Sequence, residues 1–588
     1  MTDIRRTLLW GIFLASLFFI WESWNRHNGQ PSMFGPPVAR VAAPVAGAGN
    51  ASPPLGSALP GTATAAAAAA GPVPSVAVAG SAPVTSEKIA ITTDLVRATF
   101  DTKGADLVGL VLLHQEEHPE RPWYTSFLAI FGKEGPPPPR QNVVLFDESP
   151  QRYYVAQTGL WPSASGPGAL PEHHTPMMLV STERSLNDGV NELQVRFESP
   201  ETGKVRLVKT FTFRRGDFAI GVRHEIVNAS GAPISPLLYL QLLRDGNPAP
   251  GGTSFYSTFT GPAIYTETNH YEKIAFSAIE KRETPGKVVR EESPSGWVAM
   301  VQHYFVSAWL VDKSAAPASP WEFFSGKVDT NTYSVGMLVP VGQIAAGATK
   351  VIDAKLFAGP QEENKITALA PGLELVKDYG IFKVISEPLF WLLTQLHKLF
   401  GNWGWSIVGL VVLLKIAFYW LNAKAYGSMA KMKAINPKIM DMRARLKDKP
   451  QQMQQEMMRI YREEKVNPLG GCLPIFVQMP FFIALYWVLL SSVEMRGAPW
   501  IGWIHDLSAK DPYFILPLLM TGTSLLQTWL NPTPPDPVQA KMMWIMPLIF
   551  SVMFFVFPAG LVLYWLTNNI LSIAQQYVIN KRLGVLGK

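Results

Sequence analysis

An apolar stretch from Trp405 to Leu421 constrains this chain more than any other feature, because its length lets it cross a bilayer as a helix. Further apolar stretches follow it toward the C-terminal end. The segments that we expect to span a membrane lie near residues 405–421, 473–490, 513–530, 542–557 and 561–579. The sequence therefore predicts a polytopic α-helical membrane protein with a five-span core at residues 403–588.

Lys415 is the only charged residue in the first of these stretches. Placing such a charge inside a membrane costs about 2.5–3.5 kcal/mol, so an intramembrane lysine is a candidate functional residue. The other stretches contain no Asp or Glu that would pair with it. The ammonium group therefore either faces water or reaches toward the membrane surface near Leu421, about 9 Å away along the helix. The residues alone leave both interpretations open.

The composition fits a membrane unit joined to a separate soluble part. Of the 588 residues, 48% are hydrophobic and only 16% are charged, which is low for a soluble protein. The net charge of +6 is small for this length and gives no reason to expect a specific nucleic-acid target. Cys472 is the only cysteine, so an internal disulfide is excluded.

The placement of Lys and Arg sets the expected topology, because cytoplasmic loops are enriched in these residues. Residues 1–27 combine basic residues and an apolar stretch with no small-residue cleavage site, so we expect an uncleaved N-terminal membrane anchor. The segment 423–466 is strongly basic, whereas 491–512 is nearly free of basic residues. Six spans with both termini in the cytoplasm satisfy this pattern, and they place the large region after the anchor outside.

That outer region divides into a tether and a β-rich domain. Residues 28–86 are rich in Ala, Pro and Gly, a composition typical of disordered tethers. Residues 87–360 change to short alternating strands separated by turn residues. Val205–Phe213 and Phe218–Val227, for example, alternate apolar and polar residues around a turn and predict a β-hairpin. We therefore expect a large antiparallel β-sandwich.

Helix signals return in residues 361–402. Leu373, Val376 and Tyr379 fall on one helical face, so we expect a short amphipathic helix that lies on the membrane surface. Pro388 is expected to break this helix.

A helical hairpin is expected in the cytoplasm between the second and third spans. Residues 423–466 have two helix-compatible halves, and Pro450 suits the first turn of the second helix. The hairpin is basic and rich in methionine, so it is either a solvated loop near anionic lipid or an adaptable surface for nascent chains or the ribosome. Its candidate contact residues are Lys431, Met432, Lys433, Arg443, Arg445 and Met457.

The sequence shows no P-loop, H-E-x-x-H or C-x-x-C pattern, so we expect no cofactor or metal site, and nothing indicates an enzyme. The adjacent His173 and His174 stand in a loop flanked by prolines and are expected at the surface. The spans do carry uncharged polar residues, which either hydrogen-bond between helices or line a wet groove with Lys415. These candidate groove residues are Gln478, Ser524, Gln527, Asn568 and Asn569.

Four motifs resemble the Oxa/YidC/Alb family of membrane insertases. They are Y-G-S-M-A-K-M at 426–432, E-K-V-N-P-L-G-G-C-L-P at 464–474, W-I-H-D-L-S-A-K-D-P at 503–512 and F-P-A-G-L-V-L-Y at 557–564. The resemblance is strong from Trp403 to Gln576 and weaker through the β-rich region.

The resemblance implies a protein of the bacterial inner membrane, with the sandwich in the periplasm, that inserts and helps fold other membrane proteins. It implies action alone or with the Sec translocon, through a hydrophilic groove whose basic residue attracts acidic parts of the substrate. Lys415 falls at that position, where Gram-negative members often have arginine. The implied partners are nascent membrane proteins, the Sec translocon, membrane lipids and, weakly or transiently, the ribosome.

Two other functions are compatible with parts of the sequence. A secondary transporter would also place a lone lysine in a span, but it would need a substrate site built from two related halves, and no such repeat is visible. A periplasmic assembly factor with a passive membrane anchor would not need five C-terminal spans.

Overall fold

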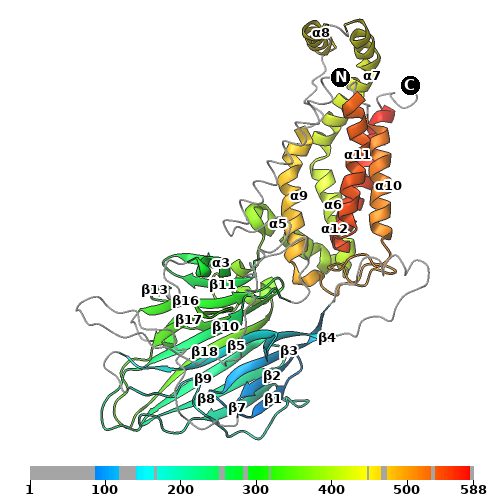
Figure 1. Cartoon of the computed structure of the whole chain (residues 1–588). Coiled ribbons are helices and arrows are strands. Elements are labelled where there is room, and N and C mark those ends of the chain that lie inside the picture. The colour runs from blue at the N-terminus through cyan, green and yellow to red at the C-terminus, as the bar shows by residue number, and fades with distance from the viewer. Residues whose placement is uncertain are drawn as a thin grey trace, which may run out of the picture. The chain divides into compact units, whose positions relative to one another are not determined.

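The computed structural model describes residues 86–117, 141–163, 168–249, 259–281, 289–316, 320–446, 449–464, 473–531 and 537–582. These residues form two compact units, a β-rich unit up to Lys377 and a helical unit from Asp378 onward (Figure 1). The expected anchor at 1–27 and the expected tether up to residue 85 lie outside the described residues.

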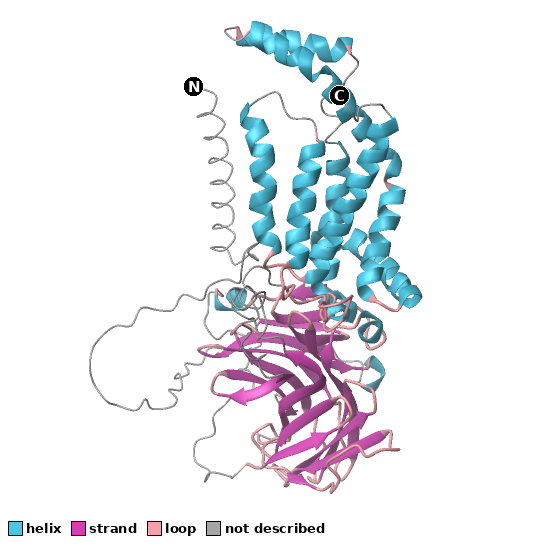
Figure 2. Cartoon of the chain, turned by 90° about the vertical axis from the view of Figure 1, so that its right-hand side faces the viewer, coloured by secondary structure: helices cyan, strands magenta, loops and turns pink. Residues whose placement is uncertain are grey.

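The β-rich unit is built from two sheets, whose strands are magenta in Figure 2. The first sheet contains β1 (Lys88–Thr92), β2 (Val96–Asp101), β3 (Asp106–Glu117), β4 (Gln141–Ser149), β5 (Arg152–Trp161), β10 (Leu237–Asp245), β13 (Val289–Ser293), β16 (Trp321–Asp329) and β17 (Thr332–Pro340). The second contains β6 (Met178–Leu179), β7 (Glu192–Glu198), β8 (Val205–Arg214), β9 (Ala219–Asn228), β11 (Gly261–Thr266), β12 (His270–Lys273), β14 (Gly296–Val301), β15 (Phe305–Val311) and β18 (Thr349–Pro360). Two short helices, α3 (Phe276–Glu280) and η1 (Lys313–Ala315), lie between strands.

The strand orders are β1-β2-β3-β4-β5-β10-β17-β16-β13 in the first sheet and β12-β11-β14-β15-β18-β9-β8-β7-β6 in the second. The pairings between these strands are antiparallel. Strands β10 and β5 are therefore central, and this arrangement places their side chains deep in the unit.

The alternation of apolar and polar residues explains how the strands pack, because successive side chains point to opposite faces of a sheet. The predicted hairpin forms between β8 and β9, where Phe211 lies opposite Val222. Gly216 turns the chain between them with a φ of 75°, a conformation that glycine adopts at low cost. Phe100 of the first sheet packs on Phe211 of the second, with ring centroids 4.5 Å apart. One buried cluster draws on both sheets, which confirms the predicted sandwich.

His173 lies elsewhere than the sequence predicted. It is buried, with 5% of its surface exposed, and its backbone N–H donates a hydrogen bond to the Tyr239 hydroxyl at 2.7 Å. Its Nδ1 lies 2.6 Å from the same hydroxyl. The surface prediction is therefore wrong for His173, because the loop after β5 folds back over the first sheet and Tyr239 supplies a partner. The neighbouring His174 is half-buried.

Burial keeps two histidines of this unit neutral. Desolvation, assisted by the neighbouring His174, lowers the pKa of His173 to about 3. Desolvation, assisted by Lys209, lowers the pKa of His224 to about 3. The Nε2 atom of His224 lies 2.9 Å from the Thr158 hydroxyl, which links β9 of the second sheet to β5 of the first. Both pKa values lie well below the ordinary 6.5 of histidine.

We expect the β-rich unit to lose stability as the pH falls from 6.5 toward 3. In this window the unfolded chain binds a proton at each of these histidines and the folded chain does not. The free energy of unfolding therefore falls by about 1.4 kcal/mol per pH unit for each histidine. His224→Gln removes one of the two groups and should make this fall shallower by about that amount.

Denaturant unfolding of the full chain, followed by tryptophan fluorescence from pH 7 to pH 4, measures this slope. His114→Gln is the matched control, because His114 is exposed, and it should leave the slope unchanged. If the free energy of unfolding fell equally steeply with pH in His224→Gln and in the unchanged protein, His224 would not be held neutral by burial.

The segment that leads out of the β-rich unit packs differently from the prediction. After β18 come α4 (Glu363–Thr367) and the short 3-10 helix η2 (Leu373–Val376). Leu373 and Val376 are fully buried in the core of the β-rich unit. The expected helix on the membrane surface at this point is therefore wrong, because the same spacing of apolar residues closes a protein core here.

The amphipathic helix of this region is α5 (Lys383–Phe400), which follows η3 (Gly380–Phe382). It buries one apolar face, which includes Leu389, and leaves Trp391 63% exposed. Pro388 was expected to break a helix, but it lies within α5. It stands close to the helix start, so its missing N–H removes a backbone hydrogen bond only near that end.

The helical unit continues with α6 (Trp403–Ala417), α7 (Tyr419–Arg445), α8 (Pro450–Glu463), α9 (Leu473–Ser491), η4 (Val493–Met495), α10 (Ile515–Leu530), α11 (Pro537–Phe554) and α12 (Ala559–Arg582). Helices α6, α9, α10, α11 and α12 run side by side (Figures 1 and 2). Helix α12 packs against α6, α9 and α10.

Taken one at a time, the helices in the described part of the chain do not combine the length and hydropathy that a membrane span needs. Helices α6 and α7 meet that requirement as a pair, with a 68° bend between them. Shorter apolar helices cover Val477–Ser491, Ile515–Leu530 and Ala540–Phe554. The number of spans therefore stays a prediction.

Candidate functional site

Lys415 lies in the last turn of α6 and has a partner on α12. Its Nζ donates a hydrogen bond to the Ser572 hydroxyl at 2.7 Å. That hydroxyl in turn donates to the backbone carbonyl of Asn568, one turn earlier in α12, at 2.7 Å. The Tyr426 hydroxyl of α7 lies near Ser572. The candidate cation is thus held at the point where α6, α7 and α12 meet.

Ser572 was not among the residues predicted from the sequence, because a charged lysine was expected to pair with a carboxylate. The signal was present, because Asn568, Ser572 and Gln575 are spaced by three, four or seven residues and so share one face of a helix. Gln575 Nε2 donates to the carbonyl of Tyr419 at 3.4 Å. A continuous polar stripe on α12 therefore faces the junction of α6 and α7.

A second polar contact joins α12 to α10. Asn569 Nδ2 donates to the Ser524 hydroxyl at 3.0 Å and lies 3.6 Å from the sulfur of Met520. Further along, Gln576 Nε2 donates to the Asn531 side chain at 3.1 Å. The structure thus brings Asn569 and Ser524 together as an interhelical hydrogen bond, one of the two roles that their sequence positions suggested.

Gln478 and Gln527 stand apart from these contacts. Gln478 belongs to α9 and Gln527 to α10, and both are half-buried. Within the described part of the chain, neither side chain makes a hydrogen bond that ties it to Lys415 or Ser572. The structure therefore supports a cluster of Lys415, Ser572 and Asn568, and it leaves the two glutamines as predictions.

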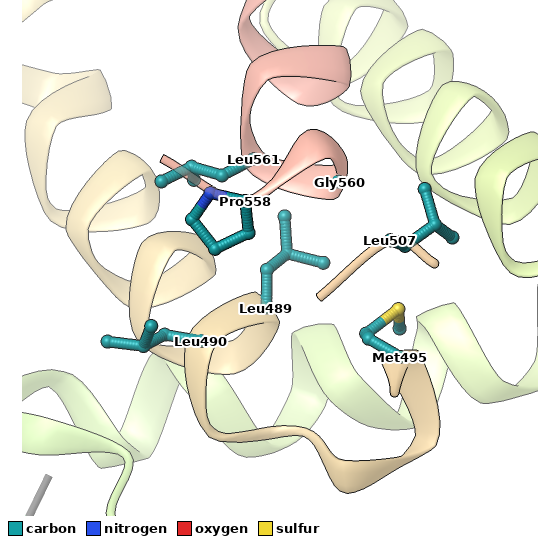
Figure 3. A pocket seen from close by; sticks show the side chains of 7 residues that line it. All are labelled: Leu489, Leu490, Met495, Leu507, Pro558, Gly560 and Leu561. Atoms are coloured by element: carbon teal, nitrogen blue, oxygen red, sulfur yellow. The ribbon is translucent and has the colours of Figure 1, made fainter. Parts of the chain in front are cut away.

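A pocket elsewhere in the helical unit has a different character. Figure 3 shows it between the end of α9 and the start of α12, lined by Leu489, Leu490, Met495, Leu507, Pro558, Gly560 and Leu561. These residues are apolar. Gly560 precedes Ser572 by twelve residues, which is about 18 Å along the helix. The pocket therefore does not belong to the polar cluster around Lys415.

Helices α7 and α8 form the predicted hairpin, and Pro450 stands in the first turn of α8 as expected. Ile435, Ile439 and Met442 are buried in the seam between the two helices. Met432 and Met457, proposed from the sequence as contact residues, pack against this seam. The methionines that are exposed are Met440, at 54%, and Met458, at 48%. Met432 and Met457 are half-buried beside the seam, and their role as contact residues stays a prediction.

The basic candidate residues of the hairpin differ in how exposed their side chains are. Lys431 and Arg445 are exposed, and an Arg445 Nη2 atom lies 3.8 Å from the Asp441 carboxylate. Arg443 is half-buried, and the side chain of Lys433 lies outside the described residues. In the described part of the chain, no three His, Cys, Asp or Glu side chains gather as a metal site.

The comparisons with known proteins agree with this architecture. Residues 395–584 match the family model described as 60Kd inner membrane protein, and residues 133–392 match the model of the YidC periplasmic domain. The chain is therefore an inner-membrane protein with a periplasmic domain.

Full-length relatives narrow this class to one family. A protein of Ralstonia nicotianae named membrane protein insertase YidC is 50% identical over 582 residues, covering 99% of this chain and 98% of that protein. A Janthinobacterium protein of the same name is 46% identical over 602 residues, covering 99% and 100%. The chain belongs to the YidC family of membrane protein insertases. A crystal structure of an active YidC insertase with its first transmembrane domain resolved aligns over 84% of this chain and 93% of that one, at 18% identity and a TM-score of 0.36.

We expect Ser572→Ala to destabilise the helical unit by about 1–2 kcal/mol, because a half-buried ammonium group loses its hydroxyl acceptor. Ser572→Thr keeps a hydroxyl and should cost less. Ser551→Ala in α11 is the matched control, since its hydroxyl bonds only the carbonyl of Pro547 in its own helix, at 2.6 Å. Unfolding of the full chain in mixed detergent micelles measures all three. A loss for Ser572→Ala no larger than for Ser551→Ala would contradict a stabilising role of the Lys415 contact.

Proposed function

We propose that this chain inserts other proteins into the bacterial inner membrane and helps them fold. The proposal is supported by relatives named membrane protein insertase YidC, which align over nearly the whole chain. In this proposal α6, α9, α10, α11 and α12 are five membrane spans and residues 1–27 supply a sixth. Both termini then lie in the cytoplasm, in keeping with the basic segment that contains α7 and α8.

The observation that carries the mechanism is the environment of Lys415. A lysine ammonium group has three N–H donors, and among the described residues Lys415 uses one of them, toward Ser572. Its partner is neutral, so the positive charge of the cluster is not cancelled. A half-buried cation with free donors is suited to receive a carboxylate of a substrate that enters the bundle.

The polar stripe of α12 extends this function along the helix. Asn568, Ser572 and Gln575 provide hydroxyl, amide and carbonyl groups that keep water near the cation. We infer that these residues and Lys415 form one side of the hydrophilic groove, with Ser524, Asn569, Gln478 and Gln527 as its further candidate residues. Water in such a groove shortens the apolar path that a polar segment has to cross.

The driving force of insertion comes from the substrate itself. Moving apolar surface from water into lipid releases roughly 25 cal/mol per Å², and a span of about 20 apolar residues provides ample surface. The groove then lowers the barrier for the polar flanks of the substrate. Lysine serves this purpose as a compact point charge, without the two-pronged geometry that arginine offers to a carboxylate.

We expect Lys415→Glu to slow the insertion of a substrate with an acidic external tail on the order of tenfold, because attraction is replaced by repulsion. Lys415→Arg keeps the charge and should stay close to the unchanged protein, with Lys415→Ala between them. Unaided insertion of a small phage-coat-like protein into proteoliposomes, followed by protease protection, measures these rates.

The same substrate with its tail carboxylates changed to amides is the matched control, and its insertion should respond little to Lys415→Glu. Equal losses for both tails would exclude charge attraction as the role of Lys415. If the unchanged protein inserted no more substrate than empty liposomes do, the proposed function itself would be rejected.

The hairpin of α7 and α8 is proposed to receive nascent chains and to contact the ribosome transiently, while the protein acts alone or beside the Sec translocon. Its exposed basic residues, such as Lys431, attract acidic surfaces, and its exposed methionines adapt to varied apolar segments. Membrane lipids are the further partner that a basic surface of this kind favours.

We expect photo-crosslinking residues placed at Met440 and Met458 to form adducts with a nascent substrate. The same residue at Ile439, which is 1% exposed in the hairpin seam, should form far fewer, because a buried position cannot reach a partner. Adducts are detected after translation of stalled substrate chains in the presence of membranes. Adducts at position 415 together with none at 440 and 458 would show that the hairpin does not receive the substrate.

A further inference from the structure

Arg244 presents an unusual arrangement inside the β-rich unit. It stands near the end of the central strand β10 and is only 1% exposed. Its Nη2 donates one hydrogen bond, to the carbonyl of Asn247 at 3.1 Å. Its Nε and Nη1 atoms are buried and have no hydrogen-bond partner among the described residues. Leaving a buried donor unpaired is costly, and more so when the group is charged.

The neighbours of Arg244 are also donors without partners. Tyr154 of β5 is the residue opposite Arg244 in the sheet register, and the Arg244 Cζ atom lies 5.6 Å from the centre of its ring. Ser307 and Gln302 lie beside the Tyr154 hydroxyl. The Tyr154 hydroxyl, the Ser307 hydroxyl and the Gln302 Nε2 atom are all buried, and in the described part of the chain they have no hydrogen-bond partner.

These groups come from both sheets. Tyr154 and Arg244 belong to the first sheet, Ser307 belongs to β15 of the second, and Gln302 lies between β14 and β15. Gln302 is fixed in place through its own backbone, whose carbonyl accepts a hydrogen bond from the Gln361 side chain at 2.8 Å. Tyr154 therefore links the two sets of groups, since Arg244 lies beside its ring and Ser307 and Gln302 lie beside its hydroxyl.

The local charge is positive. The charged groups around Arg244 are Arg152 and Asp245, so the three side chains together carry one net positive charge. Asp245 has both oxygens engaged, since Oδ2 accepts from the Tyr153 backbone N–H at 2.6 Å and Oδ1 from that of Asn247 at 2.8 Å. Arg152 donates to the carbonyls of Val144 and Leu145. The missing partner of this cluster is therefore an acceptor, and a negatively charged one.

We propose that Arg244, Tyr154, Ser307 and Gln302 form an enclosed site for a small monovalent anion of the size of chloride. An anion accepts hydrogen bonds from several donors at once and balances the guanidinium charge. A water molecule would accept from two donors, but it would leave that charge unbalanced and bring two further hydrogens. The burial of all four side chains excludes a peptide or a sugar from this position. The bound anion joins the two sheets at this end of the sandwich.

The first test measures thermal unfolding of the full chain in detergent, in sodium bromide or sodium chloride against sodium gluconate at equal ionic strength. Gluconate is too large for an enclosed site. The halides should raise the unfolding temperature of the unchanged protein by about 3–5 °C at concentrations well above the dissociation constant. Arg244→Met should abolish this difference. Arg223→Met removes an exposed arginine instead and should retain it.

A second variant keeps the test decisive if Arg244→Met fails to fold. Tyr154→Phe keeps the ring and removes one hydroxyl donor, so it should raise the halide concentration needed for half of the effect several-fold. Bromide also scatters anomalously, and crystals of the full chain grown in sodium bromide should show an anomalous peak within hydrogen-bond distance of Arg244 Nε and Nη1. A halide effect that persists in Arg244→Met, or ordinary water density without an anomalous peak, would overturn the proposal.

Discussion

The hydrogen bond from Lys415 to Ser572 is the interaction around which the helical unit is organised. An ammonium group among apolar helices needs an acceptor, and α12 supplies one at 2.7 Å. The same helix bonds α10 through Asn569 and Ser524, and it approaches the start of α7 through Gln575. Helix α12 thus makes polar contacts with three neighbouring helices, α6, α7 and α10, through two of its faces. An apolar substitution on this helix would disturb the charge of the site and the packing of the bundle together.

The β-rich unit also contains a lysine away from water, and backbone carbonyls stabilise its charge. Lys209 is fully buried, and its Nζ donates to the carbonyls of Gly104 and Thr158, both at 2.5 Å. Desolvation lowers the pKa of Lys209 to about 8, although the nearby Asp106 opposes the shift. This lysine is tied to backbone atoms of the opposite sheet and has a structural role. Lys415 differs because it is half-buried and, among the described residues, donates one hydrogen bond, to a side chain.

Local patterns of the sequence predicted a large part of this architecture. The alternation of residues 205–227 predicted the hairpin of β8 and β9, and Pro450 correctly marked the start of α8. Such features depend on residues close together in the chain, where spacing and turn chemistry decide the outcome. The apolar stretches likewise lie within a few residues of α6, α9, α10, α11 and α12.

The errors concern contacts between distant residues. Leu373 and Val376 have the spacing of a surface helix, but which apolar surface covers them depends on a sheet formed by other parts of the chain. His173 is buried because Tyr239, a residue of β10, lies beneath its loop. Ser572 was overlooked because a charge was expected to need an opposite charge, whereas a hydroxyl with its own hydrogen directed to Asn568 also serves as acceptor.

Half-burial of Lys415 is the feature on which its proposed role in attracting a substrate depends. Two opposite charges 4 Å apart attract by about 1 kcal/mol in bulk water and by about 4 kcal/mol in the environment of a protein surface. Full exposure would therefore leave Lys415 too weak to hold an acidic segment. Full burial, as in Lys209, would close the ammonium group off from a substrate. A neutral hydroxyl partner at the edge of a polar stripe places Lys415 between these limits, which is the arrangement that the proposed function requires.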